Sequence, residues 1–323
     1  MQFITAIDLY LLSVIALIRL GSWGCRGRMR SFLSKTAAVV SYRVSWTKRR
    51  LSEQNLSQAF TGQLSPDQLR SIVKSSFYQF WAEAFSIPQP CVPDEGGVQV
   101  EIRGLEYLQR AKDNRKGAIL WESGYFGRRF FLKRILQQHG FAVHQVYGEN
   151  HAAGFYTPCP ASWVRRRVIT RFFDNCEKQY VAEILALPLW EPLPVVRVLF
   201  QRLKRNCIIC TAGDGTLGWN SVRKKFLGRE RVFFTGMVSL SRSTGAPILP
   251  VFCIEENKDK IVIVIEPAIN VAPTMDRPSA SEIYIDRFAS LLEKHIKNHP
   301  AQYYNWHFQY DSARAHGSQT ASL

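Results

Sequence analysis

Side chains that could perform acid–base chemistry gather directly after a predicted strand, in the segment 117–140. The apolar run 118–121 predicts a buried strand, and Glu122 follows at its carboxyl end. Ligands usually bind at this edge of an open α/β sheet, and burial there would raise the pKa of Glu122 towards that of a general base. The alternative is a surface carboxylate that pairs with a neighbouring arginine.

Two arginines begin the helix that is predicted to follow this strand. Arg128 and Arg129 come after a turn that contains two glycines, and they precede apolar residues at helical spacing that end at Gly140. The first backbone N–H groups of a helix favour anions. Ser123, Arg128 and Arg129 are therefore candidates for binding a phosphate or an oxyanion. In the alternative interpretation, the arginines form a basic patch that faces a membrane.

Further polar candidates follow later strands. His151 lies in a polar loop after the predicted strand 141–146, and it is either a second candidate base or an exposed loop residue. Asp214 lies in Ala-Gly-Asp-Gly-Thr, where it would form an Asx turn or contact the polar head of a substrate. Lys224 follows in a basic segment and is a candidate for substrate binding.

The elements that must position these residues alternate between strand and helix from residue 93 onwards. Ser65 and Pro66 predict the start of an earlier helix, which ends at Ser86. Continuous apolar strands between helices predict an α/β fold with a mixed, largely parallel sheet flanked by helices. Strands are expected at 98–102, 117–121, 141–146, 207–211, 247–254 and 261–266, and helices at 105–111, 128–139 and 281–298.

The composition restricts the partners of the chain. Its 323 residues are 46% hydrophobic, enough for a large core, and 42 Lys and Arg against 26 Asp and Glu give a formal net charge of +16. Such charge attracts anionic membranes, nucleic acid or acidic proteins. The seven scattered cysteines do not indicate a disulfide framework. Cys207 and Cys210 would point to opposite faces of a strand, which argues against a metal site.

The N-terminal segment resembles a weak membrane helix. Residues 4–20 are mostly apolar but include Asp8 and Arg19, and the arginine-rich run after them fits an anchor at the cytoplasmic face. The alternative is a buried helix of an ordinary core. The expected organisation is an anchor helix at 1–24, a basic helical and membrane-associated extension at 25–92, an α/β domain at 93–311 and a disordered tail at 312–323.

Several short motifs occur in an order that matches a known family. The segment from Tyr125 to Phe130 resembles a His-Phe-Gly-Asn-Trp-Glu signature, and Asp214 lies where that family has an aspartate in a turn. Later matches are Phe226, Gly228, Thr235, Gly236, Gly245, Ala246, Pro250, Pro300, Gln302 and Trp306. Together these residues resemble the bacterial lipid A biosynthesis acyltransferases, within the lysophospholipid acyltransferase superfamily.

The resemblance implies an activity and also shows a departure from it. It implies a protein at the cytoplasmic face of the bacterial inner membrane that transfers a fatty acyl chain from acyl carrier protein or coenzyme A to a lipid or glycolipid hydroxyl, without a cofactor. In this family a His deprotonates the hydroxyl and an acidic residue orients that His. Tyr125 and Phe130 stand at these two positions, and a phenol has a reference pKa of about 10.

Two interpretations of this departure stay open. Glu122, Tyr125 or His151 supplies the missing catalytic group, or the chain is a catalytically inactive lipid-binding or scaffold protein. A nucleic-acid-binding module would explain the positive charge but not the ordered motifs. We therefore expect no nucleic-acid partner.

Overall fold

The computed structural model describes residue 4 and residues 6–22, 27–88, 98–148, 151–152, 155–156, 162–188, 193–215, 220–271 and 274–308. At 151–152 and 155–156 it describes the backbone alone, so the side chain of His151 lies outside the description. The tail at 312–323 also lies outside the described residues.

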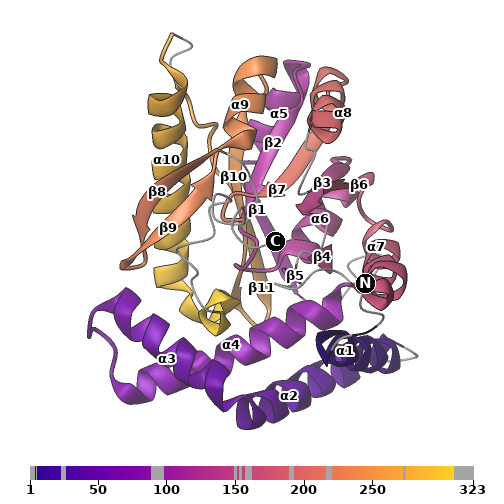
Figure 1. Cartoon of the computed structure of the whole chain (residues 1–323), viewed down its shortest axis with the longest axis vertical. Coiled ribbons are helices and arrows are strands. Elements are labelled where there is room, and N and C mark those ends of the chain that lie inside the picture. The colour runs from indigo at the N-terminus through magenta and orange to yellow at the C-terminus, as the bar shows by residue number, and fades with distance from the viewer. Residues whose placement is uncertain are drawn as a thin grey trace, which may run out of the picture.

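A seven-stranded sheet forms the centre of the molecule (Figure 1). Its strands, in spatial order, are β1 (Gln99–Arg103), β11 (Lys260–Ile265), β10 (Ile248–Asn257), β2 (Ala118–Glu122), β7 (Ile208–Ala212), β3 (Val143–Gly148) and β6 (Glu183–Leu187). Strands β10 and β11 are antiparallel, and every other neighbouring pair is parallel. The expected mixed, largely parallel sheet is therefore confirmed.

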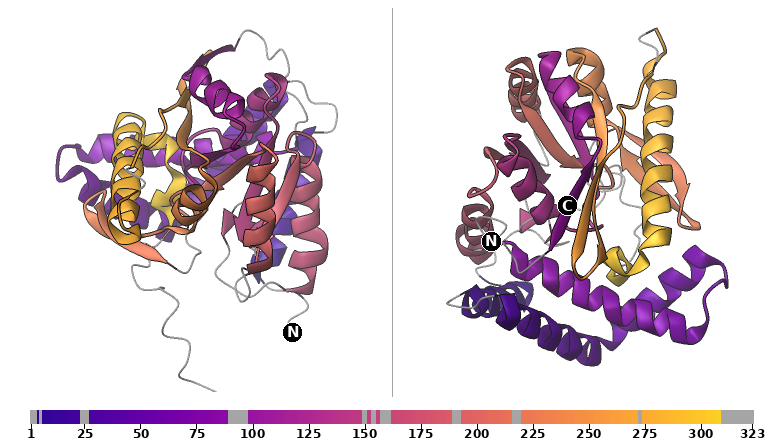
Figure 2. Two further views of the ribbon diagram at one scale, coloured as in Figure 1. Left: turned by 90° about the horizontal axis from the view of Figure 1, so that it is seen from above. Right: turned by 180° about the vertical axis from the view of Figure 1, so that it is seen from behind.

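Helices flank this sheet, as the alternating pattern predicted (Figure 2). The long helix α10 packs on the sheet through Phe288, whose ring lies 4.9 Å from that of Trp121 and 6.2 Å from that of Phe252. The helices that follow β1 are α5 (Leu105–Asp113), α6 (Arg129–Gln138), α7 (Thr170–Glu177), α8 (Leu193–Lys204), α9 (Gly236–Thr244) and α10 (Arg277–Asn298).

Two small antiparallel ladders lie outside the main sheet and were not expected. Strands β8 (Ser221–Phe226) and β9 (Arg229–Phe234) form a hairpin that packs against α10. Strands β4 (His151–Ala152) and β5 (Phe155–Tyr156) pair through two residues each, and His151 is opposite Tyr156.

Four N-terminal helices form a layer beside the sheet: α1 (Ala6–Ser22), α2 (Gly27–Val44), α3 (Trp46–Phe60) and α4 (Pro66–Ser86). The predicted start of α4 is confirmed, because Ser65 and Gln68 form a capping box in which each side chain accepts the other residue's backbone N–H, at 3.3 and 2.8 Å. Helix α4 lies between α2 and the sheet (Figure 1). It contacts α6 and the short helices η2 (Pro300–Gln302) and η3 (Tyr304–His307).

Helix α1 packs one side into the molecule. Leu11, Ile15 and Ile18 are buried, and Asp8 pairs at 2.9 Å with Arg165 of the π-helix η1 (Arg165–Ile169), both side chains being fully buried. Among the residues described, no helix is both long enough and apolar enough to cross a membrane. The anchor role expected for residues 1–24 stays a prediction.

The buried pair between Asp8 and Arg165 gives a first prediction. Replacing Asp8→Ala leaves the guanidinium of Arg165 without its buried carboxylate, so the free energy of unfolding should fall by about 3–5 kcal/mol. Urea denaturation measures this loss. In the matched control, Asp67→Ala breaks an exposed pair with Arg70 and should cost less than about 1 kcal/mol. Equal losses in the two variants would contradict the structural role of the buried pair.

A second prediction concerns pH. His307 is buried against Phe77 and bonded to Ser76 at 2.9 Å, and burial lowers its pKa to about 3 from the ordinary 6.5. Below pH 6.5 the His307 imidazole binds a proton in the unfolded chain but not in the folded chain. Its contribution to the free energy of unfolding is therefore fully present above pH 6.5 and is lost as the pH falls towards 3. His307→Gln should reduce this loss by about 1.4 kcal/mol for each pH unit between 6 and 4. The check is the urea unfolding midpoint of His307→Gln, measured between pH 6 and 4. A midpoint that falls with pH as steeply as in the wild-type chain would refute this role of His307.

Candidate functional site

Asp214 ties together the turn that follows β2 and the turn that follows β7. Its carboxylate accepts hydrogen bonds from the Ser123 hydroxyl and the Gly124 amide, both at 2.6 Å, and it is fully buried. The Gly213 amide also donates to the Glu122 carbonyl at 2.8 Å. The carboxyl ends of these two neighbouring parallel strands are therefore held as one unit, which we call the corner (residues 122–129 and 212–215).

The corner approaches β10 closely at a glycine. Gly127 has a φ of +72°, and a Cβ atom there would lie 2.1 Å from the Cys253 carbonyl oxygen. The neighbouring Arg128 amide donates to that same oxygen at 2.9 Å. Any larger residue at 127 would push the turn away from β10, which explains why this position requires glycine.

Glu122 is buried and paired with cations. Its Oε1 atom lies 3.7 Å from Arg129 Nε and 3.6 Å from Lys133 Nζ, and Lys133 also pairs with Glu177 at 2.8 Å. Burial alone would lower the pKa of Lys133, but Glu122 and Glu177 hold it above its ordinary value. The result is a buried network of two acids and two bases. Of the two interpretations of Glu122, the geometry favours the paired carboxylate, although the pair is buried and not at the surface.

The start of α6 already holds a carboxylate. Glu83 of α4 accepts a hydrogen bond from the Phe130 amide at 2.9 Å, and Arg128 Nε donates to Glu255 at 2.9 Å. Arg129 is buried and donates to the Gly124 carbonyl at 2.6 Å. Acidic side chains therefore already take the positions of an anion at this helix start, and the binding of a phosphate or an oxyanion by Arg128 and Arg129 stays a prediction.

Tyr125 lies at the corner but is unsuited to act as a base. Its partly exposed ring faces the rings of Tyr304 and Phe308 at 6.2 and 6.0 Å. Burial, which outweighs the nearby Arg231, raises its pKa well above that of a free phenol. At neutral pH the hydroxyl is therefore protonated and suited to donate a hydrogen bond, and a catalytic role for Tyr125 stays a prediction.

The structure places the other residues singled out from the sequence on α6, β8 and β4. Phe130 is fully buried in α6, with Lys133 Nζ 5.1 Å from its ring centre. Lys224 of β8 pairs with Asp286 of α10, and both side chains are about half exposed. His151 lies in the short β4–β5 ladder.

Several residues that hold the corner were not identified from the sequence. Arg231 of β9 donates to the Asp214 carbonyl at 2.6 Å, and the Tyr304 hydroxyl donates to the Gly124 carbonyl at 3.3 Å. Glu83 is buried, and burial raises its pKa above the ordinary range although Arg128 opposes this. These residues come from three separate elements with no local motif, so only the fold brings them together.

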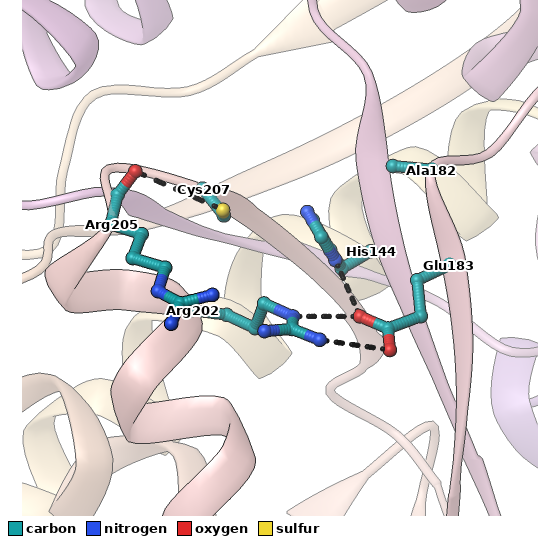
Figure 3. A pocket seen from close by; sticks show the side chains of 6 residues that line it. All are labelled: His144, Ala182, Glu183, Arg202, Arg205 and Cys207. Atoms are coloured by element: carbon teal, nitrogen blue, oxygen red, sulfur yellow. Dashed lines mark hydrogen bonds and ion pairs between the residues drawn. The ribbon is translucent and has the colours of Figure 1, made fainter.

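A pocket of about 460 Å³ lies at the opposite edge of the sheet, near the amino ends of β3, β6 and β7 (Figure 3). Glu183 accepts hydrogen bonds there from Arg202 Nε at 2.8 Å and His144 Nδ1 at 3.0 Å. The Arg202 hydrogen bond is the main cause of the lowered pKa of Glu183. Because ligands of open α/β sheets bind at the carboxyl ends of the strands, we place the candidate site at the corner instead.

The role of Asp214 gives a third prediction. Asp214→Ala removes the acceptor of two buried hydrogen bonds, so the free energy of unfolding should fall by about 3 kcal/mol in urea denaturation. Asp286→Ala breaks only the partly exposed pair with Lys224, and this matched control should cost less than about 1 kcal/mol. An Asp214→Ala chain as stable as the control would show that Asp214 does not hold the corner.

The sequence of this chain is similar to those of known proteins. The family model of the bacterial lipid A biosynthesis acyltransferases matches residues 7–311. A phosphatidylinositol mannoside acyltransferase of Mycolicibacterium smegmatis is 27% identical over 246 residues, which cover 75% of this chain and 71% of that protein. One of Mycobacterium tuberculosis is 26% identical over 251 residues, covering 75% and 69%. With the α/β fold and the corner in place, the match shows that the chain belongs to the bacterial lipid A biosynthesis acyltransferase family.

Proposed function

We propose that the protein transfers a fatty acyl chain from acyl carrier protein or coenzyme A to a hydroxyl group of a glycolipid. The observation that carries this proposal is the corner, in which a glycine turn at the carboxyl end of β2 is held by the buried Asp214. The relatives of this chain are named phosphatidylinositol mannoside acyltransferases, and these names support a glycolipid as the acceptor.

The reaction requires few groups. The acceptor oxygen attacks the thioester carbonyl, the carbon–sulfur bond breaks, and the hydroxyl proton passes through a base to the leaving thiolate. His151 is the remaining candidate for that base, since Glu122 is paired and Tyr125 is protonated. Tyr125 is partly exposed, and its protonated hydroxyl is suited to donate a hydrogen bond to the carbonyl oxygen as negative charge develops on that oxygen.

The positive charge of the chain supports the proposed acyl donor and the proposed location at a membrane. The net charge of +16 favours encounter with an acidic carrier protein or with the phosphates of coenzyme A. The same charge, concentrated partly in residues 26–50, suits the anionic cytoplasmic face of a bacterial inner membrane. Arg128, Arg129 and Lys224 remain proposed substrate contacts, and engaging a substrate would require each of them to share or exchange its present carboxylate or carbonyl partner.

A second function is favoured by one specific observation. Where the family has its His and its acidic residue, this chain has a protonated phenol and a fully buried phenyl ring. A chain that kept the fold and lost the base would bind glycolipid or acyl donor without turnover, as a lipid-binding or scaffold protein.

The fourth prediction separates these two functions. With an acyl carrier thioester or an acyl-coenzyme A and a mannosylated phosphatidylinositol in detergent, the wild-type chain should form acylated glycolipid. His151→Ala should lower kcat by about 10²- to 10⁴-fold, as expected for loss of a general base, with an unchanged unfolding midpoint. Tyr125→Phe should lower kcat by about 10²-fold or less, because it removes one hydrogen-bond donor.

One control variant and two further outcomes make the result decisive. Lys225→Ala changes an exposed side chain of β8 and should leave kcat unchanged. A wild-type chain that binds the glycolipid stoichiometrically but acylates nothing from either donor would establish the scaffold function and exclude the enzyme. Full activity in His151→Ala would remove His151 from the mechanism.

A further inference from the structure

Helix α2 and the start of α3 carry an apolar surface that no described part of the chain covers. Phe32, Val44 and Trp46 are 62%, 77% and 61% exposed, which are high values for large apolar side chains. Val39 and Val40 lie between them and are also exposed. We call these five residues the α2 face. Phe32, Val39, Val40 and Val44 recur at helical spacing, so they form one continuous stripe along the helix.

The opposite side of α2 is packed, which fixes the direction of this stripe. Ser34 and Ala38 are buried, and the ring of Tyr42 meets that of Phe77 of α4 edge-on at 5.6 Å. Helix α4 lies between α2 and the sheet (Figure 1). The α2 face is on the side of α2 opposite to its contacts with α4, so it points away from the sheet.

Basic residues lie on the same helices as the α2 face, and the stretch of sequence that holds them contains no acidic residue. Lys35, Arg43 and Arg50 are exposed, and none of the three forms an ion pair with another residue that the structure describes. The guanidinium of Arg50 lies 5.5 Å above the ring of Trp46. Residues 27–50 contain no Asp or Glu. The surface is therefore apolar and positive together, and a second copy with the same charge would be repelled from it.

We propose that the α2 face docks on an anionic lipid bilayer, with α2 lying in the plane of the interface. Helices that lie in this way have an apolar stripe with Lys and Arg beside it, and tryptophan is favoured at the depth of the lipid headgroups. The proposal extends the proposed function, because it specifies the surface through which the protein would reach a lipid acceptor.

Docking through this face would also orient the corner. Helix α4 is in contact with α2 on one side, and on the other its Glu83 holds the start of α6, directly after the corner. The carboxyl edge of the sheet therefore faces the layer that meets the bilayer. Among the elements that the structure describes, α2, α4 and the segments packed on α4 would separate the lipid surface from the corner.

Vesicle binding by the full chain tests the proposal. The chain should bind vesicles of phosphatidylglycerol and phosphatidylcholine, and it should bind pure phosphatidylcholine at least tenfold more weakly. Phe32→Ser, Val44→Ser and Trp46→Ser together should lower affinity for the mixed vesicles by at least tenfold. Lys35→Gln, Arg43→Gln and Arg50→Gln together should lower it by about fivefold for each charge, with an effect that shrinks in high salt.

A matched control uses another exposed apolar stripe. Leu193, Val196 and Phe200 of α8 are 65%, 40% and 38% exposed, and their triple replacement by Ser should leave vesicle affinity unchanged. All variants should keep the wild-type circular dichroism spectrum and unfolding midpoint, since the replaced side chains are exposed. In the wild-type chain, brominated lipid should quench part of the tryptophan emission, and Trp46→Phe should remove that part.

Three results would overturn the docking proposal. These are wild-type affinity in the α2-face variants, an equal loss in the α8 control, or a dimer without lipid that the α2-face variants dissociate in light scattering. Acyl transfer in detergent separates this proposal from the proposed function. An inactive wild-type chain that still docks through the α2 face would refute the enzyme alone, whereas full transfer in detergent with no docking would refute the docking alone.

Discussion

The carboxylate of Asp214 is the group on which the arrangement of the corner depends. It lies at the end of one buried strand and satisfies two donors from the turn after the neighbouring strand, at 2.6 Å each and out of contact with water. The carbonyl of the same residue, Gly124, accepts hydrogen bonds from Arg129 and Tyr304. Through this single residue, β2, β7, α6 and η3 are held in one geometry.

Next to the corner, the chain buries an ionic network with no net formal charge. Glu122, Arg129, Lys133 and Glu177 bring equal numbers of positive and negative charges into a space that excludes water. Such groups are costly to bury singly and tolerable only as a set. Pairing therefore explains how these charges stay buried in the folded chain, and the network does not itself supply a free base.

The fold was predictable where burial leaves a pattern in the sequence. The strands β2, β7 and β10 are buried along nearly their whole length, so they appear as apolar runs, and α4 begins with a capping box that its sequence displays. The hairpin was missed because β8 reads Ser-Val-Arg-Lys-Lys-Phe, with alternate side chains exposed and several of them charged. The pairing of Glu122 was foreseen only as an alternative, since Lys133 and Gln145 approach it through folding. The capping of α6 by Glu83 has no local signal, because these residues lie 47 positions apart.

That last contact also bears on how the molecule opens. The Phe130 amide is one of the donors at the start of α6 that no bond within the helix can satisfy, and here α4 supplies its acceptor. If α4 detached, the first turn of α6 would lose its cap, and Gly124 and Tyr125 would lose packing from η3, which α4 also contacts. The Phe130 amide would exchange its hydrogen with solvent in the same event that frees α4. Helix α4 and the start of α6 thus belong to one cooperative unit of local unfolding, although 47 positions separate Glu83 from Phe130.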